Sequence, residues 1–263
     1  WRLDFLFTAM EPGVVTCVAY TRIMRLPCLL SALIFSLPLL TQTTLVQENF
    51  DAGNFPDSWT QQTLASDGGW LVGDNQALQS QWWTIAPHGS FIATNDDGCD
   101  CDKSADYLIM PELDMTGLEQ AVLAFSSYYD GGEFEGATEV ATVEYSLDGG
   151  ETWAVLETIS GSDNGEWGFD VLSLNALLGE SSVMLAFHYN DNGGWLYGWG
   201  LDDVSVFEPT GLDLSLTNLA MEPVVFAPSA EDLSGTVVNL GQDSIYSYTI
   251  EWSFAGESGS TTV

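Results

Sequence analysis

Strict alternation of apolar side chains in the middle of the chain restricts the fold more than any other feature. Every second residue is apolar in 140–147 (Ala141, Val143, Tyr145, Leu147) and in 182–189 (Val183, Leu185, Phe187, Tyr189). Successive side chains of a β-strand point to opposite faces, so each stretch predicts a strand with one buried face. Asp148-Gly149-Gly150 follows the first stretch and is typical of a hairpin turn.

Further short apolar runs between turn-forming residues are also expected to be strands: 45–50, 90–93, 107–110, 121–128, 152–159 and 201–207. No amphipathic helix of ordinary length is visible, and only 172–178 is expected to form a short helical turn. Many short strands with Gly-rich turns indicate an all-β fold, a jelly-roll β-sandwich over 45–208.

The strand pattern restarts after Glu208-Pro209-Thr210-Gly211, where we place a domain boundary. Further strands are expected at 212–219, 233–240 and 247–254. Within them, 235–241 followed by 248–252 looks like the opening strands of an immunoglobulin-like sandwich. We therefore expect 209–263 to be a truncated immunoglobulin-like β-sandwich domain, and the chain to be a fragment of a longer protein.

A short basic and apolar segment near the start predicts export. Arg25 follows Met24, residues 29–40 are mainly apolar, and 41–44 are small and polar. This order is typical of a signal peptide, and the apolar run is shorter than the roughly 20 residues of a membrane helix, which is the alternative. We expect 24–44 to be a signal peptide with no stable membrane insertion after cleavage, and 1–23 to be a non-native upstream segment. The protein is then secreted or at a bacterial cell surface.

Acidic side chains outnumber basic ones by a wide margin: the chain has 38 Asp and Glu, 4 Lys and Arg, and a formal net charge of −34. No basic patch is available to neutralise phosphates, which excludes nucleic acid as a partner. The charge favours capture of divalent cations, and a simply solvated acidic surface is the alternative. Because hydrophobic residues make up 46% of the chain, it can still bury a core.

Several short motifs follow one another along 45–208: 48–53 with 55–59, 106–111, 123–125, 143–150 with Trp153, and 200–206. In this order they resemble the jelly-roll modules called choice-of-anchor J, cleaved-adhesin and MAM-like domains. The resemblance implies first and last strands that lie side by side, and a secreted adhesion module that frequently binds calcium. It also implies a Ca²⁺ ion near Glu48, Asp51, Asp106 and Asp203.

Two acidic segments are where we look for calcium ligands. Residues 95–102 supply four carboxylates in one Gly-containing loop, without EF-hand spacing. Asp202 and Asp203 are expected to point to opposite faces of the closing strand, so at most one faces the core. A carboxylate buried without a partner is costly, and a cation between the opening and closing strands removes that cost. The alternative is that this pair caps a turn or bonds backbone.

The acidic loop also holds the only cysteines after residue 28, Cys99 and Cys101. In an exported protein we expect a local disulfide between them. A thiolate metal pair is the alternative, although too few further Cys and His residues are present to complete a zinc site.

Aromatic side chains form dense clusters, of which Trp195, Tyr197 and Trp199 alternate beside Asn190 and Asn192. Aromatic rings next to amide and carboxylate groups are suited to stacking on a sugar and bonding its hydroxyls, so we treat these five residues as a candidate ligand site. Core packing of the same rings is the alternative, because aromatics dominate core burial.

No catalytic motif is recognisable: the chain has no nucleophile elbow, no zinc helix and no P-loop. We expect His88 and His188 to be structural. The leading hypothesis is a secreted, non-catalytic, calcium-stabilised adhesion module that binds a glycan or an extracellular or cell-surface protein. The alternative is an accessory domain of a secreted hydrolase, such as a peptidase, whose catalytic domain lies outside this fragment.

Overall fold

The computed structural model describes residues 5–9, 15–19, 43–161, 165–220, 234–241, 243–254 and 257–263. The chain divides into two compact units: Thr43–Glu208, and Trp1–Gln42 together with Pro209–Val263. In the described part no helix is long and apolar enough to cross a membrane. The expected signal peptide lies outside the described residues except for Thr43 and Thr44, which open strand β3.

One sheet of the first unit has six strands, and all of their pairings are antiparallel. In order across the sheet they are β13 (Gly168–Ser173), β8 (Val122–Tyr129), β15 (Gly198–Glu208), β6 (Ser90–Asn95) and β5 (Leu71–Asp74). β3 (Thr43–Glu48) also pairs with β15, along its C-terminal half, while β6 pairs along its N-terminal half. The first and last strands of the unit are therefore neighbours, as the resemblance implied.

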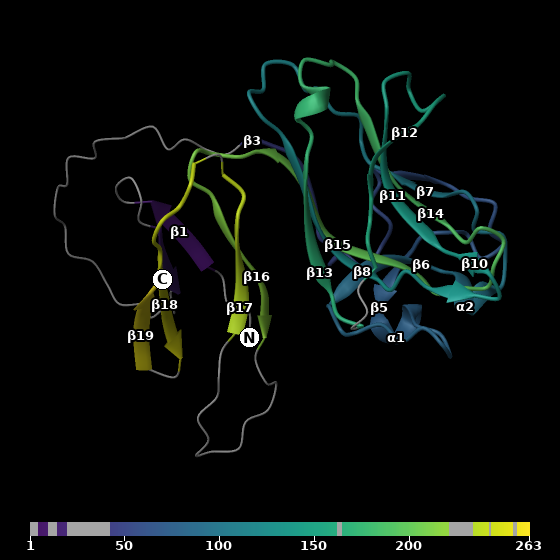
Figure 1. Ribbon diagram of the computed structural model, residues 1–263, viewed down its shortest axis with the longest axis horizontal. Helices are drawn as coiled ribbons and strands as arrows, with labels where there is room; N and C mark the ends of the chain where they lie inside the picture. The colour runs from purple at the N-terminus through teal and green to yellow at the C-terminus, as the bar shows by residue number, and fades with distance from the viewer. Residues whose placement is uncertain are drawn as a thin grey trace. The chain divides into compact units, whose positions relative to one another are not determined.

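The other sheet has five strands, ordered β12 (Ala154–Thr158), β11 (Val140–Ser146), β14 (Met184–Asn190), β7 (Asp106–Ile109) and β4 (Thr60–Gln62). A separate two-stranded ribbon joins β9 (Glu133–Phe134) to β10 (Ala137–Thr138). Three short helical segments lie between strands: α1 (Asn75–Leu78), α2 (Asp96–Cys99) and the 3₁₀ turn η1 (Asn175–Leu177). Figure 1 shows the two sheets as facing layers.

The core fills the space between these layers. Phe125 of β8 and Phe187 of β14 meet edge to face with ring centroids 5.0 Å apart, and both are fully buried. The alternating residues Val143 and Leu185 are also fully buried, whereas Leu147, beyond the end of β11, is 48% exposed. The alternation therefore identified the core faces of β11 and β14, and the jelly-roll β-sandwich is confirmed.

The second unit is described only in pieces. β16 (Leu214–Ala220) pairs with β17 (Ser234–Asn239), and β18 (Thr249–Phe254) pairs with β19 (Glu257–Thr262). β1 (Phe5–Ala9) pairs with β2 (Val15–Ala19), and Thr16 of β2 meets Thr249 in parallel register. The strands expected after residue 211 are present, and the immunoglobulin-like assignment of 209–263 stays a prediction.

Candidate functional site

A β-bulge interrupts the closing strand β15 at the acidic pair. The register of β15 against β8 shifts between Asp202 and Ser205, and Asp203 has a φ of +50°, in the left-handed region. The Oδ2 atoms of Asp202 and Asp203 both lie 3.7 Å from Nε2 of His88. The expectation that the two carboxylates point to opposite faces was wrong, because a bulge with a left-handed residue turns the second side chain towards the first.

The opening strand brings two further carboxylates to this bulge. Glu48 pairs with Val204, next to Asp203, and its Oε1 accepts a hydrogen bond of 2.8 Å from the N–H of Phe50. Phe50 also has a positive φ, +49°, and the next residue is Asp51. Two paired segments thus carry non-glycine residues in left-handed conformation, and such residues are uncommon away from sites that need them.

Asp202 shows how these charges act on one another. It is 4% exposed, and its Oδ1 accepts a hydrogen bond of 2.8 Å from the N–H of Asp203. The pKa of Asp202 is raised to about 8, first by burial and then by the charges of Asp203, Asp51 and Glu48, in that order. At neutral pH, a bound proton or a nearby cation is therefore needed to offset the burial of the Asp202 carboxylate and its repulsion by the neighbouring carboxylates.

The fourth residue of the expected calcium set, Asp106, lies in the opposite sheet on β7. Its buried carboxylate accepts hydrogen bonds from Lys103 Nζ at 3.2 Å, from Thr94 Oγ1 at 2.6 Å and from Thr63 Oγ1. Lys103 Nζ also bonds Asp67 at 3.0 Å and is fully buried. An ammonium group already neutralises Asp106, so we leave this residue out of the bulge site and keep Glu48, Asp51 and Asp203, joined by Asp202.

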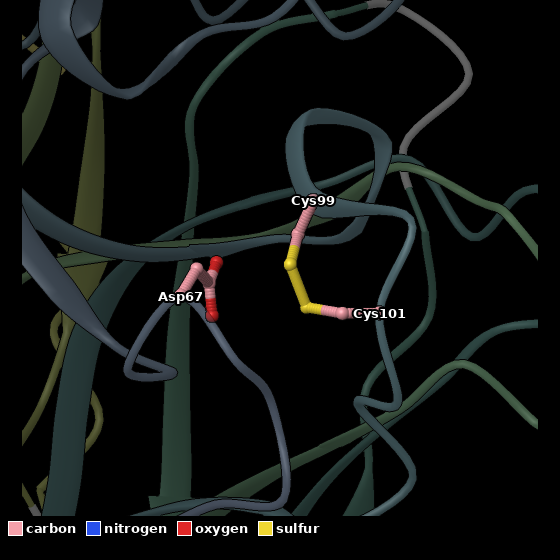
Figure 2. A group of neighbouring side chains, drawn as sticks. All are labelled: Asp67, Cys99 and Cys101. Atoms are coloured by element: carbon pink, nitrogen blue, oxygen red, sulfur yellow. A yellow bond between two sulfur atoms is a disulfide. The ribbon is translucent and has the colours of Figure 1, made fainter.

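The acidic loop after β6 is held by its own side chains. Asn95 caps α2 by accepting a hydrogen bond of 2.8 Å from the N–H of Gly98, and a disulfide joins Cys99 to Cys101. Figure 2 shows Asp67 beside the bonded sulfurs. Because the sulfurs bond each other, the alternative of a thiolate metal pair does not apply to this structure.

Asp96 is the loop's buried carboxylate. Its side chain is fully buried, its Oδ2 accepts a hydrogen bond of 2.6 Å from the N–H of Leu196, and its Oδ1 has no partner. The pKa of Asp96 is raised to about 7, first by burial and then by the charges of Asp191 and Glu139, while the N–H of Leu196 and the charge of Lys103 act in the opposite direction. Nothing in the sequence distinguished Asp96 from the other three Asp residues of this loop.

The aromatic stripe is divided between the core and the surface. Trp199 is fully buried, where its Nε1 donates to Ser127 Oγ at 2.9 Å, whereas Trp195 is 45% exposed and Tyr197 is 37% exposed. Alternation along the chain fails at Gly198, which has a φ of +152° and would place a Cβ only 2.3 Å from the carbonyl oxygen of Thr94. Trp199 is therefore a core residue, and the ligand site does not include it.

Another tryptophan, which the sequence analysis did not single out for binding, joins the exposed rings. Trp82 is 67% exposed, and its N–H donates to Asp97 Oδ2 at 3.0 Å. The indole Nε1 of Trp195 donates to the carbonyl oxygen of Asp97 at 3.1 Å. The carbonyl of Tyr197 accepts from the N–H groups of Asp96 and Asp97, at 2.8 and 3.2 Å. We call Trp82, Trp195 and Tyr197 the aromatic patch.

The two asparagines beside the patch are engaged within their loop. Asn190 Oδ1 accepts a hydrogen bond of 2.7 Å from the N–H of Asn192, and Asn192 Nδ2 donates to the carbonyl oxygen of Thr138 at 2.7 Å. An acidic depression opens at the same loop, lined by Asp100, Cys101, Asp102, Ser104, Asp191, Gly193 and Gly194.

The histidines have different surroundings. His188 Nδ1 lies 2.8 Å from Glu144 Oε1, and its ring stacks on Tyr107 with centroids 3.9 Å apart, which fits a structural role. His88 stacks on Trp167 with centroids 4.2 Å apart and faces the carboxylates of the bulge. No other histidine occurs in the sequence.

No protein-family model matches the chain, and no curated protein matches it either. Among solved structures it is similar to the K1 cleaved adhesin domain of Lys-gingipain from Porphyromonas gingivalis W83, with 22% identity, 62% of this chain and 97% of that chain covered, and a TM-score of 0.43. It is also similar to TmCBM61 in complex with β-1,4-galactotriose (13% identity, 64% and 99% covered, TM-score 0.41). A third similar structure is the CBM22-1 xylan-binding domain from Paenibacillus barcinonensis Xyn10C, with 12% identity, 64% of this chain and 96% of that chain covered, and a TM-score of 0.40. Scores this low support no conclusion about ligand or activity.

Proposed function

We propose that Thr43–Glu208 is a secreted, non-catalytic binding module that holds a neutral glycan on the aromatic patch. The observation that carries this proposal is that Asp97 accepts hydrogen bonds from the backbone N–H of Trp82 and from the indole Nε1 of Trp195, while both indole rings stay exposed. Large aromatic side chains are seldom left together in water without a partner. Their faces are suited to the C–H faces of sugar rings, and the adjacent carboxylates accept hydrogen bonds from hydroxyl groups.

The charge of the chain selects among glycans. With a net charge of −34, and with Asp97, Asp100 and Asp102 beside the patch, uronic acids and sulfated sugars are repelled. A glycan is favoured over a protein partner because Asp97, which bonds the chain at Trp82 and the indole of Trp195, offers carboxylate oxygens to sugar hydroxyl groups beside the exposed rings. The Cys99–Cys101 disulfide supports the secreted setting, since such bonds persist in oxidising compartments.

Binding to immobilised polysaccharides tests the proposal. The full chain is expected to be retained by at least one neutral glycan, and not by pectate or heparin. Trp82→Ala and Trp195→Ala are each expected to weaken retention about 10-fold, which corresponds to roughly 1.4 kcal/mol. Tyr246→Ala is the matched control, because this ring is 93% exposed and belongs to the other unit. Equal retention of all four proteins would show that the patch is not the binding surface.

We also propose that the bulge binds Ca²⁺ through Glu48, Asp51, Asp202 and Asp203. Calcium takes six to eight hard oxygen ligands, and these carboxylates supply oxygens from β3, from the turn that follows it and from β15. The ion offsets the burial and the repulsion that raise the pKa of Asp202, so it ties the opening strand to the closing strand.

Thermal unfolding in EDTA and in excess Ca²⁺ tests the bulge site. An ion present at about 100 times its Kd stabilises the folded state by roughly 2.7 kcal/mol. We expect Ca²⁺ to raise the Tm of the wild type, and a smaller rise in Asp203→Asn. An identical Tm in both buffers rules out calcium stabilisation.

A further inference from the structure

His88 stands between the two carboxylates of the bulge without a hydrogen bond to either of them. Its Nε2 atom lies 3.7 Å from Asp202 Oδ2 and 3.7 Å from Asp203 Oδ2. A donor and an acceptor this far apart do not form a hydrogen bond. Within the described part of the chain, no other group donates to or accepts from the ring nitrogens of His88. Three metal-ligating groups therefore face one another with their ligand atoms free.

Asp202 supplies the buried side of this cluster. The residue is 4% exposed, and its Oδ1 is occupied by the N–H of Asp203 at 2.8 Å. Its Oδ2 faces the imidazole of His88 and accepts no hydrogen bond from the residues that the structure describes. Folded proteins rarely keep a buried carboxylate oxygen in this condition unless a water, an ion or a ligand meets it.

The spacing of the three ligand atoms fits a single small metal ion. One nitrogen of His88 and one oxygen from each of Asp202 and Asp203 all lie within 4.8 Å of one another. Zinc binds imidazole nitrogen and carboxylate oxygen at about 2.0–2.2 Å, so two ligands of a tetrahedral zinc ion lie about 3.4 Å apart. The two separations of 3.7 Å from Nε2 are close to that value.

The imidazole is held in this position by the loop before β6. The His88 ring stacks on the indole of Trp167, with centroids 4.2 Å apart and planes 22° apart. The indole Nε1 of Trp167 in turn donates to the carbonyl oxygen of Ala86 at 2.8 Å, two residues before His88. The His88 side chain is 27% exposed, so an ion can reach Nε2 from solvent.

We propose that His88 Nε2 and one carboxylate oxygen from each of Asp202 and Asp203 bind Zn²⁺, with water as the fourth ligand. Zinc accepts imidazole and carboxylate together, whereas calcium takes oxygen ligands and leaves the imidazole unused. Two carboxylates and a neutral imidazole also balance the charge of the ion. The zinc site shares Asp202 and Asp203 with the proposed calcium site, so the two ions exclude each other, but it needs neither Glu48 nor Asp51.

Equilibrium dialysis of the full chain against Zn²⁺ tests the site. The wild type is expected to bind one tight equivalent, and so is the control Asp57→Asn, which removes an exposed carboxylate. Loss of a residue that only orients a metal ligand weakens binding about 10–100-fold, so His88→Gln and Asp203→Asn, which remove a ligand, are expected to weaken it at least about 100-fold. Glu48→Gln is expected to keep the equivalent.

The side chain of Asp203 is 58% exposed, so Asp203→Asn carries the test if His88→Gln fails to fold. A tight Zn²⁺ equivalent that persists in either variant overturns the site, and so does a wild type without tight binding. Loss of the equivalent in Glu48→Gln as well overturns the assignment of the three ligands.

Dialysis of the same proteins against Ca²⁺ separates this inference from the proposed function. Zn²⁺ bound through His88 by a wild type that binds no Ca²⁺ supports the zinc site and overturns the calcium proposal. Ca²⁺ that is lost in Glu48→Gln and kept in His88→Gln, with no tight Zn²⁺ in any of the proteins, supports the calcium proposal and overturns the zinc site.

Discussion

Asp202→Asn is the substitution whose effect follows most directly from the bulge. The Asp202 carboxylate is 4% exposed and faces the charges of Asp203, Asp51 and Glu48. Asparagine keeps the shape and an acceptor oxygen for the N–H of Asp203, and it removes the buried charge. Whether this substitution raises or lowers the free energy of unfolding depends on pH and on bound calcium.

The sign follows from linkage. The folded-state pKa of Asp202 is raised from its ordinary value of 3.8 to about 8, so the folded protein binds a proton more tightly than the unfolded chain. The associated stability is fully present below pH 3.8 and is lost as pH rises through about 8. Because one pKa unit corresponds to about 1.36 kcal/mol, full ionisation of Asp202 in the folded protein without bound Ca²⁺ lowers the free energy of unfolding by up to about 5–6 kcal/mol.

Urea unfolding between pH 5 and 9 in EDTA measures this loss. We expect the free energy of unfolding of the wild type to fall by several kcal/mol over that interval, and that of Asp202→Asn to fall much less. Saturating Ca²⁺ is expected to flatten the wild-type curve and to leave the variant unchanged. Asp57→Asn, which removes an exposed carboxylate, is the control and follows the wild type. Equal slopes for the wild type and Asp202→Asn in EDTA would refute the reasoning.

Three further predictions concern stability away from the bulge. Lys103→Met leaves Asp106 and Asp67 without their ammonium partner, so we expect a loss of about 3–5 kcal/mol in urea unfolding, and a loss below about 1 kcal/mol would contradict it. Trp199→Ala is expected to lower the free energy of unfolding by about 3–5 kcal/mol, and Trp195→Ala to lower it by less than about 0.5 kcal/mol, because only the Trp199 ring is in the core. Similar losses in the two variants would contradict this difference in burial. Reduction of the Cys99–Cys101 bond is expected to lower stability by about 1–2 kcal/mol, the value for a very short loop, and a Tm unaffected by dithiothreitol would count against it.

The strands were predictable because their signal is local. Alternation placed Val143 and Leu185 on buried faces, since a strand's side chains alternate wherever its neighbours lie. β4, β5 and β13 were not anticipated. β13 has no fully buried residue, and its last two residues, Leu172 and Ser173, belong to the stretch in which only a helical turn was expected.

The candidate sites were predictable only in part, because their geometry depends on contacts between distant segments. The resemblance named Glu48, Asp51 and Asp203, which lie around the bulge, but it could not show that Lys103 neutralises Asp106. That the first three bind calcium stays a prediction. Nothing in Asp202-Asp203 announces a bulge, because the left-handed conformation of Asp203 arises from pairing with β3 and β8. The exposure of Trp82 and the burial of Trp199 likewise follow from the loops around them.

Calorimetric titration of a retained neutral oligosaccharide tests the binding surface most directly. Wild-type chain and the double variant Trp82→Ala/Trp195→Ala are compared at equal calcium concentration. Two independent losses of about 1.4 kcal/mol predict a Kd about 100-fold weaker for the double variant, with Tyr246→Ala unchanged. A double variant that binds as tightly as the wild type would contradict the proposal that the aromatic patch holds the glycan.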